Sequence, residues 1–362
     1  MTTTSFSPED TNAPEIGFGI IGLGMIAHKH AQAIQATPGA KLMAGLGTNP
    51  GRAADFAAKY GVKAYTDLDT FLAHPGLSVV NICVPSGDHA HFGMAAALAG
   101  KHVMVEKPLE VTVEAADRLI EACRKAGVKL AVISQRRFEP HIQRLRNAIE
   151  AGHFGELLSA DVFIKWYRTQ EYYDSAPWRG TYRLDGGGAL MNQGVHYVDV
   201  LQWLVGQVKS VRAITRTAAH NIEVEDLALA LLTFENGAVG VLEASTMHYP
   251  GLLERLEISG RNGTAVLEAG KFKVWEFKLP PDEAPVQIDD TVGESGAKNP
   301  GDISYQGHAY QVADMVAALR ENREPAITGE DGRKPLEIIQ AVYQSAREGR
   351  EIFLTQKSEN AT

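Results

Sequence analysis

The chain contains 362 residues, of which 44% are hydrophobic and 22% are charged, as is typical of a globular protein with about two domains. Its formal net charge is −9, and no segment concentrates enough lysine and arginine to bind a phosphate backbone, so nucleic acid is not an expected partner. The two cysteines, Cys83 and Cys123, stand in apolar segments without metal-ligand spacing, which favours a reducing compartment and predicts no metal site.

Residues 1–14 are polar and acidic, lack the apolar stretch of a signal peptide, and are predicted to form a disordered tail. No later segment reaches 18 consecutive apolar residues, so we expect no contact with a membrane. A cytoplasmic location is predicted.

Short apolar runs alternate with helical patterns from residue 15 to residue 135. This alternation predicts a doubly wound parallel sheet, the Rossmann dinucleotide-binding arrangement, because each parallel crossover needs a helix. The predicted strands are 16–21, 41–46, 78–84, 102–106 and 129–134, and the predicted helices are 25–37, 50–60, 88–100 and 113–126.

The pattern changes over residues 136–362. Long strand-like runs follow one another there, with turn signals at Asn236-Gly237 and Asn262-Gly263 that favour antiparallel hairpins. We expect an α+β domain with an antiparallel or mixed sheet covered by helices on one face. Its predicted helices are 138–151, 189–205, 305–322 and 332–348, with a long loop at 279–304.

Glycines follow the first predicted strand in the pattern Gly22-x-Gly24-x-x-Ala27. The first two glycines permit a tight turn and close approach of a pyrophosphate, and the small third residue lets helix and strand pack. The free N–H groups of the helix N-terminus then favour an anion. The segment is therefore predicted to bind a dinucleotide.

The second strand of such a domain usually ends in an acidic residue that binds the ribose hydroxyls of NAD, but Gly47 occupies that place. Thr48 and Arg52 follow and can bind a 2′-phosphate, although Arg52 is equally compatible with an exposed helix position. The cofactor is expected to be NAD or NADP, with a slight preference for NADP.

Four motifs, "GIIGLGMIAHKH", "NICVPSGDHA", "EKPLEVT" and "GGGALMNQGVHYVDVLQWLVG", occur in this order along the chain. In these segments and their spacing the chain resembles the Gfo/Idh/MocA oxidoreductases over nearly its whole length after the tail. The resemblance implies an N-terminal Rossmann domain and a C-terminal α+β domain whose open, mostly antiparallel sheet makes oligomer contacts. It also implies NAD(P)-dependent oxidation or reduction of hydroxyl groups on sugars, polyols or nucleotide sugars, by a homo-oligomer, either a dimer or a tetramer.

By the same resemblance, Lys107 is the lysine of the family's E-K-P motif, His196 is its catalytic histidine, and Pro85 and His89 belong to a loop beside the nicotinamide. Asn192 stands where many members have aspartate. The expected cofactor contacts are Gly22, Gly24, Met25, Ile26, Ala27, Gly47, Thr48, Asn49, Arg52, Pro85, Ser86, His89, Glu106, Lys107 and Gln135.

The chemistry assigns different roles to the three expected catalytic residues, Lys107, His196 and Asn192. A histidine can remove a hydroxyl proton near neutral pH, and a lysine ammonium can stabilise the developing alkoxide. An asparagine cannot titrate, so Asn192 is expected to orient the alcohol by hydrogen bonds.

Aromatic and arginine side chains are concentrated in the segment 163–188, where they are suited to stack on sugar rings and bind hydroxyls or anions. Gln135, Arg136 and Arg137 lie at the end of the last parallel strand and can reach nicotinamide or an anionic substrate. The expected substrate contacts are Lys107, Arg137, Trp166, Arg168, Tyr173, Trp178, Arg179, Asn192 and His196.

Two other functions are compatible with the same motifs. One is an enzyme that retains its cofactor and performs a net redox-neutral reaction on glycosides. The other is a cofactor-sensing regulatory protein without turnover, although the presence of Lys107 and His196 argues against it.

Overall fold

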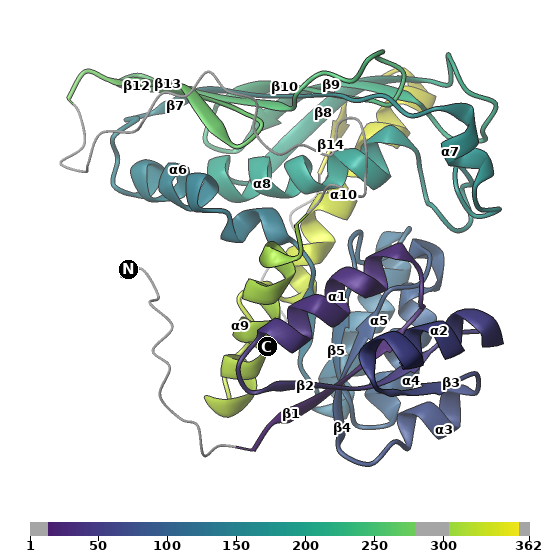
Figure 1. Cartoon of the computed structure of the whole chain (residues 1–362). Coiled ribbons are helices and arrows are strands. Elements are labelled where there is room, and N and C mark those ends of the chain that lie inside the picture. The colour runs from purple at the N-terminus through teal and green to yellow at the C-terminus, as the bar shows by residue number, and fades with distance from the viewer. Residues whose placement is uncertain (1–13, 280–303, 355–362) are drawn as a thin grey trace.

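The computed structural model describes residues 14–279 and 304–354. Two sheets, one above the other in Figure 1, form the cores of its lower and upper halves. The predicted tail and the predicted loop at 279–304 lie, apart from their end residues, outside the described residues. Within those residues, no helix combines the length and apolar character needed to cross a membrane.

The lower half is a parallel sheet with strand order β3-β2-β1-β4-β5-β6, which is the Rossmann order and confirms the predicted fold. Its strands are β1 (Ile16–Ile21), β2 (Ala40–Leu46), β3 (Lys63–Tyr65), β4 (Leu77–Ile82), β5 (His102–Val105) and β6 (Leu130–Val132). Its helices are α1 (Met25–Ala36), α2 (Pro50–Tyr60), α3 (Leu68–Leu72), α4 (His89–Leu98) and α5 (Val113–Ala126).

The helix boundaries of this half follow from local capping. The Asn49 side chain accepts a hydrogen bond from the Arg52 amide and begins α2 at Pro50, while Thr112 caps α5 in the same way through Ala115. Gly127 ends α5 in the left-handed conformation. These signals are visible in the sequence, which explains why α2 and α5 were predicted to the residue.

The upper half contains an eight-stranded sheet in the order β13-β12-β11-β7-β10-β9-β8-β14. Only β7 and β10 pair in parallel, so the sheet is mostly antiparallel, as predicted. Its strands are β7 (Leu157–Lys165), β8 (Val208–Arg216), β9 (Leu227–Phe234), β10 (Val239–Ser245), β11 (Arg255–Gly260), β12 (Gly263–Glu268), β13 (Lys271–Phe277) and β14 (Ile352–Phe353).

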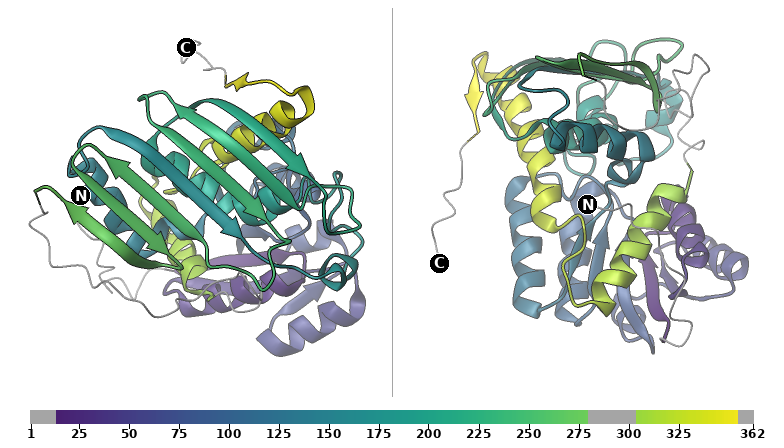
Figure 2. Two further views of the ribbon diagram at one scale, coloured as in Figure 1. Left: turned by 90° about the horizontal axis from the view of Figure 1, so that it is seen from above. Right: turned by 90° about the vertical axis from the view of Figure 1, so that its left-hand side faces the viewer.

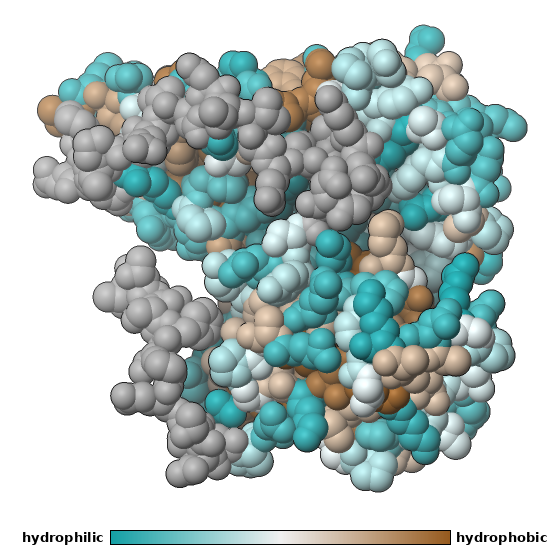
Figure 3. Space-filling model, in the orientation of Figure 1, coloured by the Kyte–Doolittle hydropathy of each residue, from teal (hydrophilic) through white to brown (hydrophobic). Residues whose placement is uncertain are grey.

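Helices α6 (Pro140–Glu150), α8 (Val195–Val205) and part of α10 (Gly329–Glu348) cover the lower face of this sheet. The view from above in Figure 2 shows the strands of the opposite face without a covering helix. The burial of β9 alternates accordingly, with Ala228 and Ala230 buried, and Leu229 and Leu231 exposed. In Figure 3, apolar residues reach the surface at places along the upper rim of the molecule, among polar ones.

The C-terminal helices join the two halves. Helix α9 (Gln306–Arg320) packs against α1, and its Val312 and Met315 share a buried cluster with Phe18 of the parallel sheet. Helix α10 contacts both β8 in the upper sheet and α5 in the lower half. The chain thus returns to the Rossmann half after completing the second sheet.

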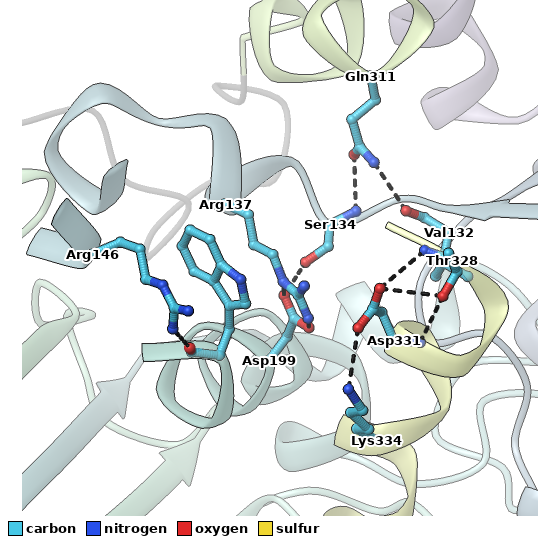
Figure 4. A network of polar contacts seen from close by, with 10 residues as sticks. Val132, Ser134, Arg137, Arg146, Asp199, Gln311, Thr328, Asp331 and Lys334 are labelled. Carbon is cyan, nitrogen blue, oxygen red and sulfur yellow. Dashed lines mark hydrogen bonds and ion pairs between the residues drawn. The ribbon is translucent and has the colours of Figure 1, made fainter. Parts of the chain in front are cut away.

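Figure 4 shows the polar network where these segments meet. The side chain of Gln311 on α9 accepts from the Ser134 amide and donates to the Val132 carbonyl, which anchors the segment after β6. Ser134 and Arg137 both donate to Asp199 of α8. One buried carboxylate therefore links the end of the parallel sheet to the central helix of the upper half.

Candidate functional site

A cavity of about 1060 Å³ lies between the two halves. One end is formed by the loops at the carboxyl edge of the parallel sheet, which is where ligands bind in such sheets. The other end is formed by α7 (Gln170–Asp174), the loop after it, and the segment that begins α8. Most of the residues predicted for cofactor and substrate line this one space.

The loop after β1 fits a dinucleotide. Gly22 has φ +91°, and a Cβ there would lie 2.7 Å from the carbonyl oxygen of Cys83, so only glycine allows the two loops to approach. Helix α1 begins at Met25, and its N-cap residue Gly24 provides no side-chain cap, which leaves the first N–H groups available to an anion. Gly24, Met25 and Ile26 also line the cavity.

The end of β2 forms the next part of the wall through Gly47, Thr48, Asn49 and Arg52. No acidic residue stands at this point of the described cavity lining, in agreement with the sequence. The Asn49 amide oxygen caps α2, so its side chain is already used within the protein. Thr48 and Arg52 are the polar groups that remain for the ribose end of a cofactor.

Lys107 follows β5 and points across the cavity toward the upper half. Its Nζ donates to the backbone carbonyl of Asn192 at 3.0 Å. Burial lowers the pKa of Lys107, while the nearby carboxylates of Glu106 and Asp185 oppose that shift. His89 supports the same loop, because its ring nitrogens lie 2.9 Å from the Pro108 carbonyl and 3.0 Å from that of Val84.

Glu106 is held by two histidines from helices far apart in the sequence. Its Oε1 lies 2.7 Å from Nε2 of His30 on α1 and 3.2 Å from Nε2 of His308 on α9. Despite its burial, these two hydrogen bonds keep the pKa of Glu106 well below its ordinary value. The three side chains also form a donor set with metal-ligand chemistry, but both contacts have hydrogen-bond lengths.

The prediction of one continuous α-helix over 189–205 is wrong for its first six residues. Residues Ala189–Gly194 form a π-helical turn, and the α-helix α8 begins only at Val195. The first turn is held from outside, because the Glu225 carboxylate accepts from the amides of Gly188 and Leu190 at 2.9 Å. Burial raises the pKa of Glu225 to about 7. This altered register presents the Asn192 carbonyl to Lys107.

His196 and Asn192 both line the cavity, so the π-turn preserves the predicted pairing. His196 is buried, and its Nδ1 has no hydrogen-bond partner among the described residues. Burial, together with the charges of Lys107 and Arg136, holds the pKa of His196 well below its ordinary value, so the ring is neutral at pH 7. The side chain of Asn192 donates to Oδ1 of Asp185 at 2.7 Å.

Asp185 was not among the predicted site residues, although it directly precedes the glycine-rich motif. It supplies a carboxylate one hydrogen bond away from the position where many family members have aspartate. Burial raises its pKa, against the hydrogen bonds from the Gly180 amide and Asn192 and the charges of Arg179 and Lys107.

Arginine and aromatic side chains form the wall opposite the parallel sheet. Trp166, Arg168, Trp178 and Arg179 line the cavity there, and Arg136 lines it from the turn that follows β6. Other lining residues were not among the predicted contacts: Lys29, Thr66, Asp88, Glu139, His141, Tyr172, Gln193, Lys271 and Tyr310. Of these, Tyr172 belongs to the aromatic segment 163–188, and Lys29, Asp88 and Gln193 stand within the recognised motifs, whereas the others are isolated in the sequence.

Three predicted contacts do not line the cavity. Ala27 is fully buried and packs inside the Rossmann half, in the helix-packing role expected for the third small residue. Arg137 is predicted wrongly as a substrate contact, because its guanidinium forms a buried pair with Asp199. Tyr173 is also buried, and its hydroxyl is hydrogen-bonded to Thr246 at 2.7 Å.

Comparison with protein families resolves the identity of the fold. Residues 16–134 match the oxidoreductase family with an NAD-binding Rossmann fold, and residues 142–266 match the Gfo/Idh/MocA C-terminal domain. The chain belongs to the Gfo/Idh/MocA oxidoreductase family. It is an NAD-dependent oxidoreductase that acts on CH–OH groups of sugar-like compounds, as the sequence predicted.

Three similar proteins are named as dehydrogenases. The WlbA dehydrogenase of Bordetella pertussis, solved in complex with NADH and UDP-GlcNAcA, is 35% identical with a TM-score of 0.85, over 95% of this chain and 100% of that one. Myo-inositol 2-dehydrogenase of Thermotoga maritima is 26% identical over 93% of this chain and 98% of its own. Levoglucosan dehydrogenase of Pseudarthrobacter phenanthrenivorans is 26% identical over 91% of this chain and 96% of its own.

Proposed function

We propose that this oxidoreductase transfers a hydride between NAD and a hydroxyl-bearing ring carbon of an acidic nucleotide sugar. The observation that carries the proposal is the placement of Arg168 and Arg179 at the substrate end of the cavity, in a chain whose net charge is −9. Local positive charge in an acidic protein favours an anionic ligand. The 35% identity to a dehydrogenase solved with UDP-GlcNAcA supports the same class.

In this proposal His196 is the general base. The ring is neutral at pH 7 because its pKa is lowered, and a neutral imidazole accepts the proton of the sugar hydroxyl. Lys107 places its ammonium beside the same oxygen and stabilises the negative charge that develops there. NAD, when bound, supplies the hydride acceptor.

Asn192 orients the sugar in this scheme. Its amide nitrogen donates to Asp185 at 2.7 Å, and its amide oxygen lies 3.2 Å from Nε2 of Gln193. Because both ends of the amide are held, the side chain is fixed before substrate arrives, which reduces the entropy lost on binding.

The proposal is tested by following NADH formation at 340 nm in mixtures of the enzyme, NAD and one candidate substrate. The candidates are UDP-GlcNAcA, UDP-GlcNAc, myo-inositol and levoglucosan. Turnover of the acidic nucleotide sugar with stoichiometric formation of free NADH is the expected result. Turnover restricted to uncharged sugars or polyols would contradict it. Substrate conversion without release of NADH would instead identify the retained-cofactor alternative.

We also propose that NADP binds at least as well as NAD. Gly47 leaves no carboxylate to repel a 2′-phosphate, and Thr48 and Arg52 stand at the same end of the cavity. Gly47→Asp is expected to shift preference toward NAD, because the added carboxylate would repel a 2′-phosphate. The new side chain can be accommodated, since the atom nearest to the added Cβ belongs to the Leu23 side chain, at 3.1 Å. Titration calorimetry with both cofactors measures this, and a strong wild-type preference for NAD that Gly47→Asp does not change would refute it.

We further propose that the uncovered face of the upper sheet binds a second copy of the chain. Ile214 on β8 is 61% exposed and lies opposite Leu229 on β9, while Leu231 is 59% exposed. Adjacent exposed aliphatic side chains on a sheet without a covering layer favour association.

A further inference from the structure

The hydroxyl of Tyr172, on the cavity wall, is surrounded by hydrogen-bond donors. Arg179 Nη1 donates to it at 2.6 Å, and Gln193 Nε2 lies 3.5 Å away. Both neighbours are donors, so the oxygen acts as the acceptor, and among the described residues no group accepts the proton of the hydroxyl itself. A ligand with acceptor oxygens would satisfy that proton.

Arg179 stands beside this hydroxyl without an ion pair to any described carboxylate. Its guanidinium lies over the rings of Tyr172 and Trp178, with 4.2 and 4.5 Å between its central carbon and the ring centroids, and its Nε is buried without a hydrogen-bond partner in the described chain. Arg136, by contrast, pairs with Glu139 and Glu254. The stacked position fixes the planar fork of Arg179 for an oxyanion.

Asp185 does not neutralise this group by direct contact. Its two oxygens accept hydrogen bonds from the Gly180 amide at 2.9 Å and from Asn192 Nδ2 at 2.7 Å. No nitrogen of Arg179 comes within ion-pair distance of a carboxylate in the part of the chain that the structure describes. The corner around Arg179 and Tyr172 therefore has donors in excess of acceptors.

The position of this corner limits which part of a substrate it can meet. Gln193 contacts both the Tyr172 hydroxyl and, at 3.2 Å, the amide oxygen of Asn192. A single side chain thus separates Tyr172 from Asn192, whose backbone carbonyl binds Lys107. An oxyanion bound at Tyr172 would therefore lie close to Asn192 and Lys107, as an acidic group on the reacting sugar ring would.

We propose that Arg179 and Tyr172 form a carboxylate subsite that selects a uronic acid, with the Arg179 fork binding the carboxylate and the Tyr172 hydroxyl donating to it. The proposal rests on the proposed function, because it assigns the acidic group of the sugar to named residues. Arg168, whose central carbon also lies over the Tyr172 ring at 5.5 Å from the centroid, adds positive charge to the same corner.

The test compares two nucleotide sugars that differ only in a carboxylate or a hydroxymethyl group, UDP-GlcNAcA and UDP-GlcNAc. Arg179→Met is expected to lower kcat/KM for the acid by roughly 10- to 100-fold, mainly through KM, and to leave the neutral sugar nearly unchanged. Tyr172→Phe is expected to lower it by roughly 10-fold for the acid alone. Arg183→Met, at an exposed position of the same loop, is the matched control and should leave both activities unchanged.

Two readouts keep folding and the proposed function separate from this inference. Binding of NADH, followed by its fluorescence, shows whether each variant retains its fold. Calorimetry of the NADH-loaded enzyme with methyl β-D-glucuronide and methyl β-D-glucoside tests the subsite even if no nucleotide sugar is turned over. Tighter binding of the glucuronide that is lost in Arg179→Met supports the subsite.

An equal loss on both nucleotide sugars would assign Arg179 to the pyrophosphate and overturn the inference. Equal affinity of the wild type for glucuronide and glucoside would overturn it as well. Failure of the wild type to turn over either nucleotide sugar, with the glucuronide preference intact, would refute the proposed substrate and leave the carboxylate subsite supported.

Discussion

Replacing Lys107 tests its proposed role in stabilising negative charge on the substrate, independently of cofactor binding. Its ammonium lies 3.0 Å from the Asn192 carbonyl, inside the cavity where the sugar oxygen would become negative. Lys107→Ala is expected to lower kcat by about 10²–10³-fold, as loss of one preorganised donor typically does, and to leave NADH affinity nearly unchanged. Steady-state kinetics and fluorescence titration measure both quantities. Near-normal turnover would show that the lysine serves only the fold.

His196 sets the pH dependence in the proposed mechanism. Burial and two neighbouring cations lower its pKa, so its protonation, which removes the base, occurs below the usual pH of 6.5 for histidine. kcat/KM for sugar oxidation is expected to be constant at neutral pH and to fall only under more acidic conditions. His196→Ala should remove this acid limb together with most of the activity.

Asn192→Ala provides the contrast for that experiment, since an amide cannot titrate. It is expected to raise KM or lower kcat while the acid limb of the pH profile remains. In Asn192→Asp a second carboxylate would face Asp185 and raise the apparent pKa of His196. An acid limb that disappears in Asn192→Ala but persists in His196→Ala would reverse the two assignments.

The sequence motifs predicted many of the residues that line the cavity but missed residues that hydrogen-bond to them. Lys107, His196 and the Gly22 turn stand in contiguous motifs whose chemistry is local, and all of them line the cavity. Asp185 and Glu225 contact the site through hydrogen bonds that form only in the folded chain, so the sequence alone does not reveal them. Arg137 was predicted to contact the substrate, but its guanidinium is already paired with the buried Asp199 carboxylate of α8.

At the scale of elements, the π-turn before α8 places the Asn192 carbonyl against Lys107. A Cβ at Gly188 would lie 1.7 Å from the carbonyl oxygen of Glu225, so any side chain there must displace one of the two segments. Gly188→Ala is expected to destabilise the protein by about 1–3 kcal/mol and to lower kcat, because the Asn192 carbonyl moves with the turn.

Urea unfolding and kinetics on the same preparation measure the two effects of Gly188→Ala. Gly51→Ala in the first turn of α2 is the control, since the nearest atom to its added Cβ is the Asn49 side-chain oxygen at 3.3 Å and alanine favours a helix. A Gly188→Ala enzyme with wild-type stability and activity would show that the turn accommodates a side chain and does not depend on close contact with Glu225.

Element types were more predictable than their hydrogen-bond registers. Alternating apolar runs and capping residues identified the Rossmann strands and helices, whereas β3 and α3 were too short to stand out. The π-turn was predicted as ordinary helix because apolar residues of Ala189–Gly194 fit either register. The Glu225 carboxylate, which accepts hydrogen bonds from this turn, lies 31 residues beyond it and in another segment.

At the scale of the molecule, the C-terminal helices connect the two functional halves. His308 on α9 and His30 on α1 both bind Glu106, the residue directly before Lys107. Helix α10 holds the other half, through the Tyr343 hydroxyl that donates to Glu225 at 2.9 Å. The segments that carry Lys107 and Asn192 are therefore each held by a helix from the C-terminal part of the described chain, and no local sequence pattern predicts these contacts.

The uncovered face of the upper sheet carries the last prediction. If Leu231 lies at the centre of a contact between two copies, Leu231→Glu would bury a charge from each copy without a partner and prevent association. Sedimentation velocity is expected to show the wild type as a dimer or tetramer and Leu231→Glu as a monomer that still binds NADH. Leu98→Glu, at an 89% exposed position on α4 of the other half, is the matched control and should sediment as the wild type does. A wild-type monomer would refute the proposed association, and an oligomer that persists in Leu231→Glu would place the interface elsewhere.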